Sequence, residues 1–331
     1  MTRLIEDSER KCVYVNIRQG IDAYLEMTKM IRLKLNWKTD KRIAMILASV
    51  YIVNQQDFQY GRFASLIEEL HYSLDKSDQV PDDFKKFYAA AIDVSVENIE
   101  GNIPYYLDLY GVFTEEGFPT GVYTYLSSLI ISEKNHVAHT LPIINDADAI
   151  YQSLKQKHRL LTNDKQYPLA TMRAAENQLH REQDQAFFYQ QLNKKRFSRG
   201  RNLLSLSQIL TLYTEYDRET LVQRTDQFFS DFIEIKIDPR PSLYPLFGLL
   251  ALLPEDTVQI SLISEIYKQL NQEKLFKQHK DISALLSVIF FVDNKAFQPY
   301  LVEILIYSIF TQLEEDAAND FFSLRNFLPF Q

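Results

Sequence analysis

The chain has 331 residues, of which 46% are hydrophobic, so it can bury a large core and is not disordered. Its 8 glycines and 11 prolines are too few for the tight turns of a sheet protein. A single cysteine, Cys12, excludes an intramolecular disulfide and predicts a cytoplasmic protein. The net charge of −8 disfavours nucleic acid as a partner, and apolar stretches of at most about 11 residues predict no membrane span.

The apolar pattern predicts helices along the whole chain. The amphipathic segment Tyr14–Leu35 comes first and could cap one end of the fold. After it, a strongly apolar segment ends in an acidic or Asn-containing turn, and an amphipathic segment follows. The apolar segments are Ile43–Val53, Phe84–Val94, Val122–Ile131, Tyr167–Ala175, Leu203–Tyr213, Leu243–Leu253 and Ile282–Val292. The amphipathic segments are Phe58–Leu70, the stretch around Tyr106–Tyr110, Leu141–Leu154, Ala186–Leu192, Leu221–Ile233, Val258–Leu270 and Tyr300–Phe310.

This alternation repeats about every 40 residues, which is close to the length of HEAT-type repeats. It predicts an all-α, right-handed α-solenoid-like stack of about seven helix pairs, forming a single domain over residues 1–331. The first helix of each pair must be buried on both sides, whereas the second can line the outside. The alternative is an irregular all-α domain of about fifteen helices. Two prolines in the segment 236–241 mark a soft hinge.

A metal site could form at Glu133, His136 and His139, because residues three apart lie on one helical face and both residue types bind zinc. Spacings of this kind are common by chance, however. The alternative is a set of polar residues that cap a turn between two helices.

A basic run could bind an anion, since it places five cations within eight residues: Lys194, Lys195, Arg196, Arg199 and Arg201. Gly200 precedes a predicted helix, and the N-terminus of a helix attracts anions. A phosphate, an acidic peptide or RNA could bind there, and the alternative is a solvated loop between repeats.

A group of tyrosines clusters around the second and third helix pairs: Tyr105, Tyr106, Tyr110, Tyr123 and Tyr125. Tyrosine provides a large contact area at low entropic cost, which suits a concave recognition surface. The alternative is that these side chains belong to the core.

Three stretches of sequence resemble a known family: "NWKTDKRIAMILASVYIVNQQDFQYGRF", "YAAAIDVSVEN" and "GFPTGVYTYLSSLII". They are similar to DUF4003, a firmicute family defined as a domain of unknown function, over most of the chain. The resemblance implies a bacterial cytosolic protein. Its motifs are packing motifs, so they transfer no catalytic residue.

No nucleophile elbow, metalloprotease helix, P-loop or dinucleotide-binding motif occurs in the sequence, which favours a non-enzyme without a cofactor. The leading hypothesis is a cytosolic helical-repeat adaptor that binds a protein or peptide on its concave face. The alternatives are a metal-dependent enzyme that uses the Glu133–His139 segment and a phosphate or nucleic-acid binding protein that uses Lys194–Arg201. The sequence does not predict an oligomeric state.

Overall fold

The computed structural model describes residues 2–35, 41–74, 80–95, 102–132, 140–179, 181–212, 216–293 and 302–313. These residues form α-helices and three short 3-10 helices, with no strand among them, which confirms the all-α prediction. The 3-10 helices are η3 (Asp164–Gln166), η4 (Pro241–Leu243) and η5 (Glu255–Thr257).

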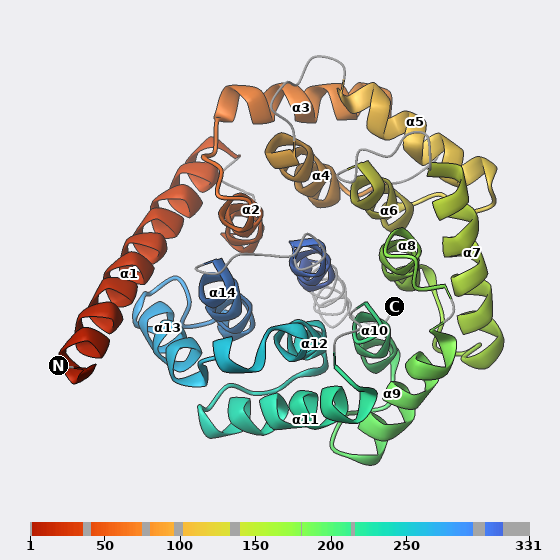
Figure 1. The fold of residues 1–331 in the computed structure, drawn as a ribbon. Coiled ribbons are helices and arrows are strands. Elements are labelled where there is room, and N and C mark those ends of the chain that lie inside the picture. The colour runs from red at the N-terminus through yellow and green to blue at the C-terminus, as the bar shows by residue number, and fades with distance from the viewer. Residues whose placement is uncertain are drawn as a thin grey trace, which may run out of the picture.

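The helices form a closed ring of two layers (Figure 1). The inner layer consists of α2 (Lys41–Val53), α4 (Asp82–Ser95), α6 (Val122–Ser132), α8 (Tyr167–Ala175), α10 (Arg201–Ile209), α12 (Tyr244–Leu252) and α14 (Lys280–Asp293). The outer layer consists of α1 (Thr2–Lys34), α3 (Tyr60–Ser73), α5 (Asn102–Glu115), α7 (Thr140–Lys157), α9 (Glu182–Lys194), α11 (Arg218–Glu234) and α13 (Ile260–Gln272). Packing of α14 against α2 closes the ring.

The order of the two helices within each pair differs from the sequence prediction, because the outer helix comes first and the inner helix second. Among the outer helices, each inner helix packs most closely against the one that precedes it in the chain, so α1 belongs to the first pair with α2 and does not cap a stack. Seven such pairs lie in the described residues. A right-handed solenoid with two free ends is not confirmed, and the alternative of an all-α domain without solenoid stacking is compatible with the structure.

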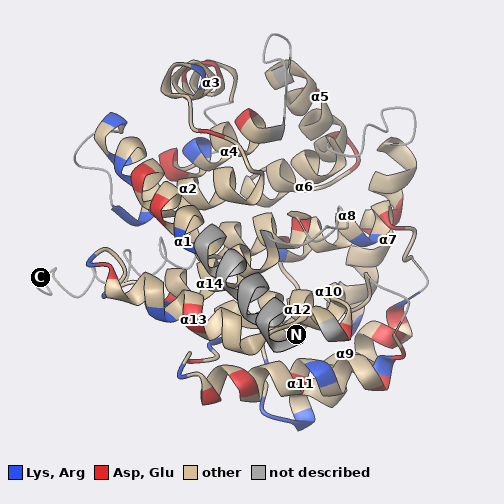
Figure 2. Ribbon diagram, turned by 60° about the vertical axis from the view of Figure 1, so that its left-hand side comes forward, with Lys and Arg blue, Asp and Glu red and all other residues tan. Residues whose placement is uncertain are grey.

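Amphipathicity decides which helices form the inner layer. Every residue of α12 is buried, and so is every residue of α6 except the partly buried Val122, because neither helix has a charged face. Outer helices bury one side; α13, for example, buries Leu262, Ile263 and Ile266 and leaves its other face polar. Among the inner helices, α6 and α12 contain no Lys, Arg, Asp or Glu, and α8 and α10 contain one each, whereas α4 carries five. Many of the other charged residues lie on outer helices such as α11 and on connections (Figure 2). The predicted roles of the apolar and amphipathic helices are confirmed for these elements.

Neighbouring inner helices run in the same direction. Close ring contacts join residues at the starts of adjacent inner helices, as between Phe118 and Tyr167 (centroids 4.6 Å apart) and between Phe197 and Tyr244 (5.0 Å). At the opposite ends, the Tyr51 hydroxyl near the end of α2 donates to Asp93 near the end of α4. The ring therefore has an N-terminal face, where the inner helices begin, and a C-terminal face, where they end.

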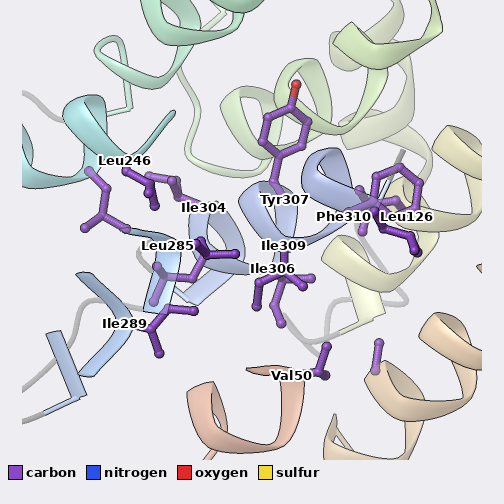
Figure 3. Packing of buried hydrophobic residues seen from close by; sticks show 14 of the residues in the cluster. Val50, Leu126, Leu246, Leu285, Ile289, Ile304, Ile306, Tyr307, Ile309 and Phe310 are labelled. Carbon is purple, nitrogen blue, oxygen red and sulfur yellow. The ribbon is translucent and has the colours of Figure 1, made fainter. Parts of the chain in front are cut away.

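The helix over residues 302–313 occupies the middle of the ring, and its residues 303–313 are all buried (Figures 1 and 3). The sequence places this segment on the outside as the second helix of the seventh pair, and that placement is wrong. Its side chains meet several inner helices at once: Phe310 contacts Phe87 of α4 and Tyr123 of α6, and Tyr307 hydrogen-bonds Ser205 of α10 (3.0 Å). A helix that is covered on all sides needs a surrounding layer, which the ring supplies.

Arginines from the outer layer cap the ends of inner helices. Arg62 of α3 donates to the carbonyl of Asp93, Arg181 donates to that of Thr211 (3.0 Å), and Arg224 of α11 donates to that of Leu253. In each case the arginine precedes the inner helix in the chain and binds a carbonyl at or near its C-terminal end. A cation there satisfies an unpaired carbonyl and opposes the negative end of the helix dipole.

Candidate functional site

The predicted tyrosine cluster is brought together inside the protein. Tyr106, Tyr110, Tyr123 and Tyr125 are buried, and Tyr105 is half-buried on α5. The rings of Tyr110 and Tyr125 stack with centroids 3.7 Å apart, and the Tyr110 hydroxyl accepts a hydrogen bond from the Gly121 amide (3.2 Å). A partner could reach the four buried side chains only if the helices around them moved.

The predicted metal segment, Glu133 to His139, lies outside the described residues. Within the residues that the structure does describe, no group of three or more His, Cys, Asp or Glu side chains could hold a metal ion.

The basic run lies between α9 and α10 and is anchored by one aromatic side chain. Phe197, in the middle of the run, is 3% exposed and packs edge-on against Phe229 of α11 and Tyr244 of α12. The next residue, Ser198, donates its backbone amide to the Tyr244 hydroxyl (2.9 Å). These contacts hold the run against two neighbouring helix pairs, so it is an ordered part of the N-terminal face.

Two of the five cations in the run are already paired. Lys195 and Arg196 both contact Asp226 of α11, at 2.8 and 3.3 Å. In the described part of the chain the other three cations, Lys194, Arg199 and Arg201, are exposed and form no ion pair. They are therefore available to bind an anion from solution.

The run belongs to a wider basic region on the N-terminal face. The four segments that lead into α8, α10, α12 and α14 are 158–166, 194–201, 235–243 and 273–281, and together they carry twelve Lys or Arg and four Asp or Glu. These segments thus have a net charge of +8 within a chain of net charge −8. The inner helices add the positive ends of their dipoles at the same face.

The C-terminal face is different in character. A cavity of about 170 Å³ lies there, lined entirely by polar residues that include Tyr51, Arg62 and Asp93. The Asp93 carboxylate is buried, forms an ion pair with Arg62 and accepts a hydrogen bond from the Tyr51 hydroxyl (2.7 Å). Burial, followed by the hydrogen bond to Asp93, raises the pKa of Tyr51, so its hydroxyl remains protonated. The charges of Arg62 and Asp93 therefore compensate each other within the protein.

The extent of the basic region was missed in the sequence because no single stretch of chain contains it. Its four segments are separated by about 40 residues each, and only the ring brings them to one face. Each segment contains two to five cations, and the alternation of basic segments before inner helices with acidic turns after them is the signal that could have revealed it.

Fold and site together define an all-helical protein built as a closed, filled ring with one basic face. No helix in the described ranges has the length and apolar character needed to cross a membrane. The chain belongs to the family described as "Protein of unknown function (DUF4003)", whose model matches residues 28–313. It is also similar to "Uncharacterized protein YeaA" of Bacillus subtilis (strain 168), with 27% identity over 297 residues, 88% of this chain and 90% of that protein. No solved structure matches the chain.

Proposed function

We propose that this protein is a non-enzymatic adaptor that binds an acidic segment of a partner protein on its N-terminal face. The observation that carries the proposal is the anchored basic run, whose exposed cations Lys194, Arg199 and Arg201 have no ion-pair partner among the described residues. The surrounding segments extend the positive potential well beyond these three side chains.

The architecture favours a face of the ring as the binding surface over its interior. The helix over 302–313 fills the space that an inner concave surface would need, and four of the five predicted tyrosines are buried. On the N-terminal face, in contrast, cations project from connections that are fixed by Phe197 and Tyr244. Fixed charges steer a partner of opposite charge and limit the entropy lost on binding.

An acidic protein segment suits this surface better than nucleic acid. The chain carries a net charge of −8, so the long, uniform charge of a nucleic acid would be repelled beyond the basic face. A short acidic segment of a partner can lie within the basic region and avoid the rest of the surface.

Fluorescence anisotropy with a labelled glutamate-rich peptide would test the proposal, with an RNA oligonucleotide of equal charge as the competing ligand. The triple variant Lys194→Ala, Arg199→Ala, Arg201→Ala should weaken peptide binding about tenfold, since three exposed charge contacts of about 0.5 kcal/mol each correspond to that factor. Binding should also weaken as the salt concentration rises.

The matched control removes three exposed cations from α1, with Lys29→Ala, Arg32→Ala and Lys34→Ala. It changes the net charge by the same amount and should leave the affinity within about twofold. Equal losses in the two variants would mean that only net charge matters and would overturn the proposed site. RNA binding that is tighter than peptide binding would overturn the proposed class of partner.

A further inference from the structure

A cavity of about 260 Å³ opens on the N-terminal face between α11, α13 and α14. Its walls come from the connection after α11, from η4, from Tyr267 of α13 and from the first residues of α14. The lining residues are Lys236, Ile237, Asp238, Arg240, Leu243, Tyr267, Lys280, Asp281 and Ala284. The cavity shares no residue with the basic run.

The charges that line the cavity are unevenly paired. Asp238 binds Arg240 (3.0 Å), and Asp281 contacts Arg42 (3.7 Å) and accepts a hydrogen bond from Gln312 of the central helix (3.0 Å). Both carboxylates are thus neutralised from within the protein.

Lys236 and Lys280 also line the cavity, but neither forms an ion pair with any residue the structure describes. Lys280 is the first residue of α14, a helix of 14 residues whose positive end therefore faces the same space. The uncompensated charge of the cavity is positive.

Lys236 occupies a backbone conformation that an ordinary residue adopts only at a cost. Its φ is +64°, and it follows the last turn of α11 with hydrogen bonds from its own amide to the Ile233 carbonyl and from the Ile237 amide to the Phe232 carbonyl. This helix ending normally takes Gly or Asn at that position. Two other helices of this chain follow the rule, with Gly117 after α5 and Asn177 after α8.

A strained residue that lines a cavity with an unpaired charge suggests a role in binding.

The remaining lining supplies a hydrogen-bond donor and an apolar floor. Burial raises the pKa of Tyr267, which keeps its hydroxyl protonated, and Ile237, Leu243 and Ala284 form the apolar part. The volume is below that of a pocket for a drug-sized ligand, so the occupant is small.

We propose that this cavity binds a small phosphomonoester, with the phosphate held between Lys236 and Lys280 at the N-terminus of α14 and a short carbon skeleton against the apolar floor. The phosphate group suits two lysines and a helix N-terminus, because it accepts several hydrogen bonds and carries more than one negative charge. The site does not use the basic run that carries the adaptor proposal, although Lys236 and Lys280 lie in the same wider basic region.

Isothermal titration calorimetry with glycerol 3-phosphate and with inorganic phosphate would test the proposal. Wild-type protein should bind glycerol 3-phosphate saturably and more tightly than inorganic phosphate, since only the former reaches the apolar floor. Lys280→Ala and Lys236→Gly should each weaken binding by about tenfold. Lys236→Gly should at the same time raise Tm by about 2 °C, because glycine relieves the backbone strain.

The matched control is Gln55→Gly. Gln55 has a φ of +53° at the equivalent position after α2, on the opposite face of the ring, so the change gives the same backbone relief away from the cavity. It should raise Tm similarly and leave phosphate affinity unchanged. The proposal would be overturned if wild type showed no saturable binding at about 10 mM ligand. It would also be overturned if wild type, Lys280→Ala, Lys236→Gly and Gln55→Gly bound with equal affinity. Glycerol 3-phosphate that binds no better than inorganic phosphate would overturn the assignment of a carbon skeleton to the apolar floor.

Discussion

Replacing Phe310 by alanine tests whether the central helix holds the ring together. The Phe310 side chain is fully buried, and its ring lies 5.1 Å from Phe84, 5.2 Å from Phe87 and 5.3 Å from Tyr123, measured between centroids. A buried Phe→Ala change costs about 3–5 kcal/mol, and aromatic contacts of this kind add about 0.5–1.5 kcal/mol per pair beyond the area they bury. We therefore expect a loss near 5 kcal/mol.

The loss would be measured as the free energy of unfolding in urea, followed by far-ultraviolet circular dichroism. Typical domains have about 5–15 kcal/mol in total, so Phe310→Ala should bring the protein close to unfolding. Phe310→Leu is the control, because it keeps most of the volume and should cost roughly 1–2 kcal/mol. If Phe310→Ala cost less than about 1 kcal/mol, the helix over 302–313 would not be the packed centre of the ring.

Four further predictions concern single sites. Gly111→Ala in α5 should raise the free energy of unfolding by about 1 kcal/mol, since a methyl group there meets nothing within 4 Å and alanine favours the helix. Gly248→Ala in α12 should lower the free energy of unfolding by about 1 kcal/mol. The new Cβ would lie 2.8 Å from the stiff Ile209 side chain of α10, and this overpacking outweighs the gain in helix propensity. Equal free energies of unfolding in urea for Gly111→Ala and Gly248→Ala would contradict the packing of α10 on α12. Arg173→Met should leave Tm unchanged or raise it. Burial lowers the pKa of Arg173 to about 10, and among the described residues its guanidinium forms one hydrogen bond, to the Gln178 carbonyl (3.3 Å). A clear fall in Tm would refute this. Burial, helped by Lys157 and Arg199, lowers the pKa of His158, so stability should fall as pH drops below about 6.5, and His158→Gln should flatten that pH dependence of Tm.

Part of the candidate site was visible in the sequence, and part depended on distant contacts. The basic run stands out because five cations occur within eight residues. The structure shows that three of them, Lys194, Arg199 and Arg201, are exposed and form no ion pair among the described residues, while anion binding there stays a prediction. The cavity at Lys236 could not be predicted from local sequence. It exists because residues near 236–243 meet the start of α14 about 40 residues later, and because Gln312 reaches back to Asp281.

The sequence by itself determined the all-α class, the alternation of apolar and amphipathic helices and the family, because helical periodicity and packing motifs are local properties of the chain. Tertiary structure alone decided that the pairs close into a ring, that α1 joins the first pair and that the helix over 302–313 fills the centre. An apolar stripe shows that a helix must be covered, but not which helix covers it. That choice depends on the curvature accumulated over all seven pairs and on contacts such as that of α14 with α2, whose residues are more than 200 positions apart.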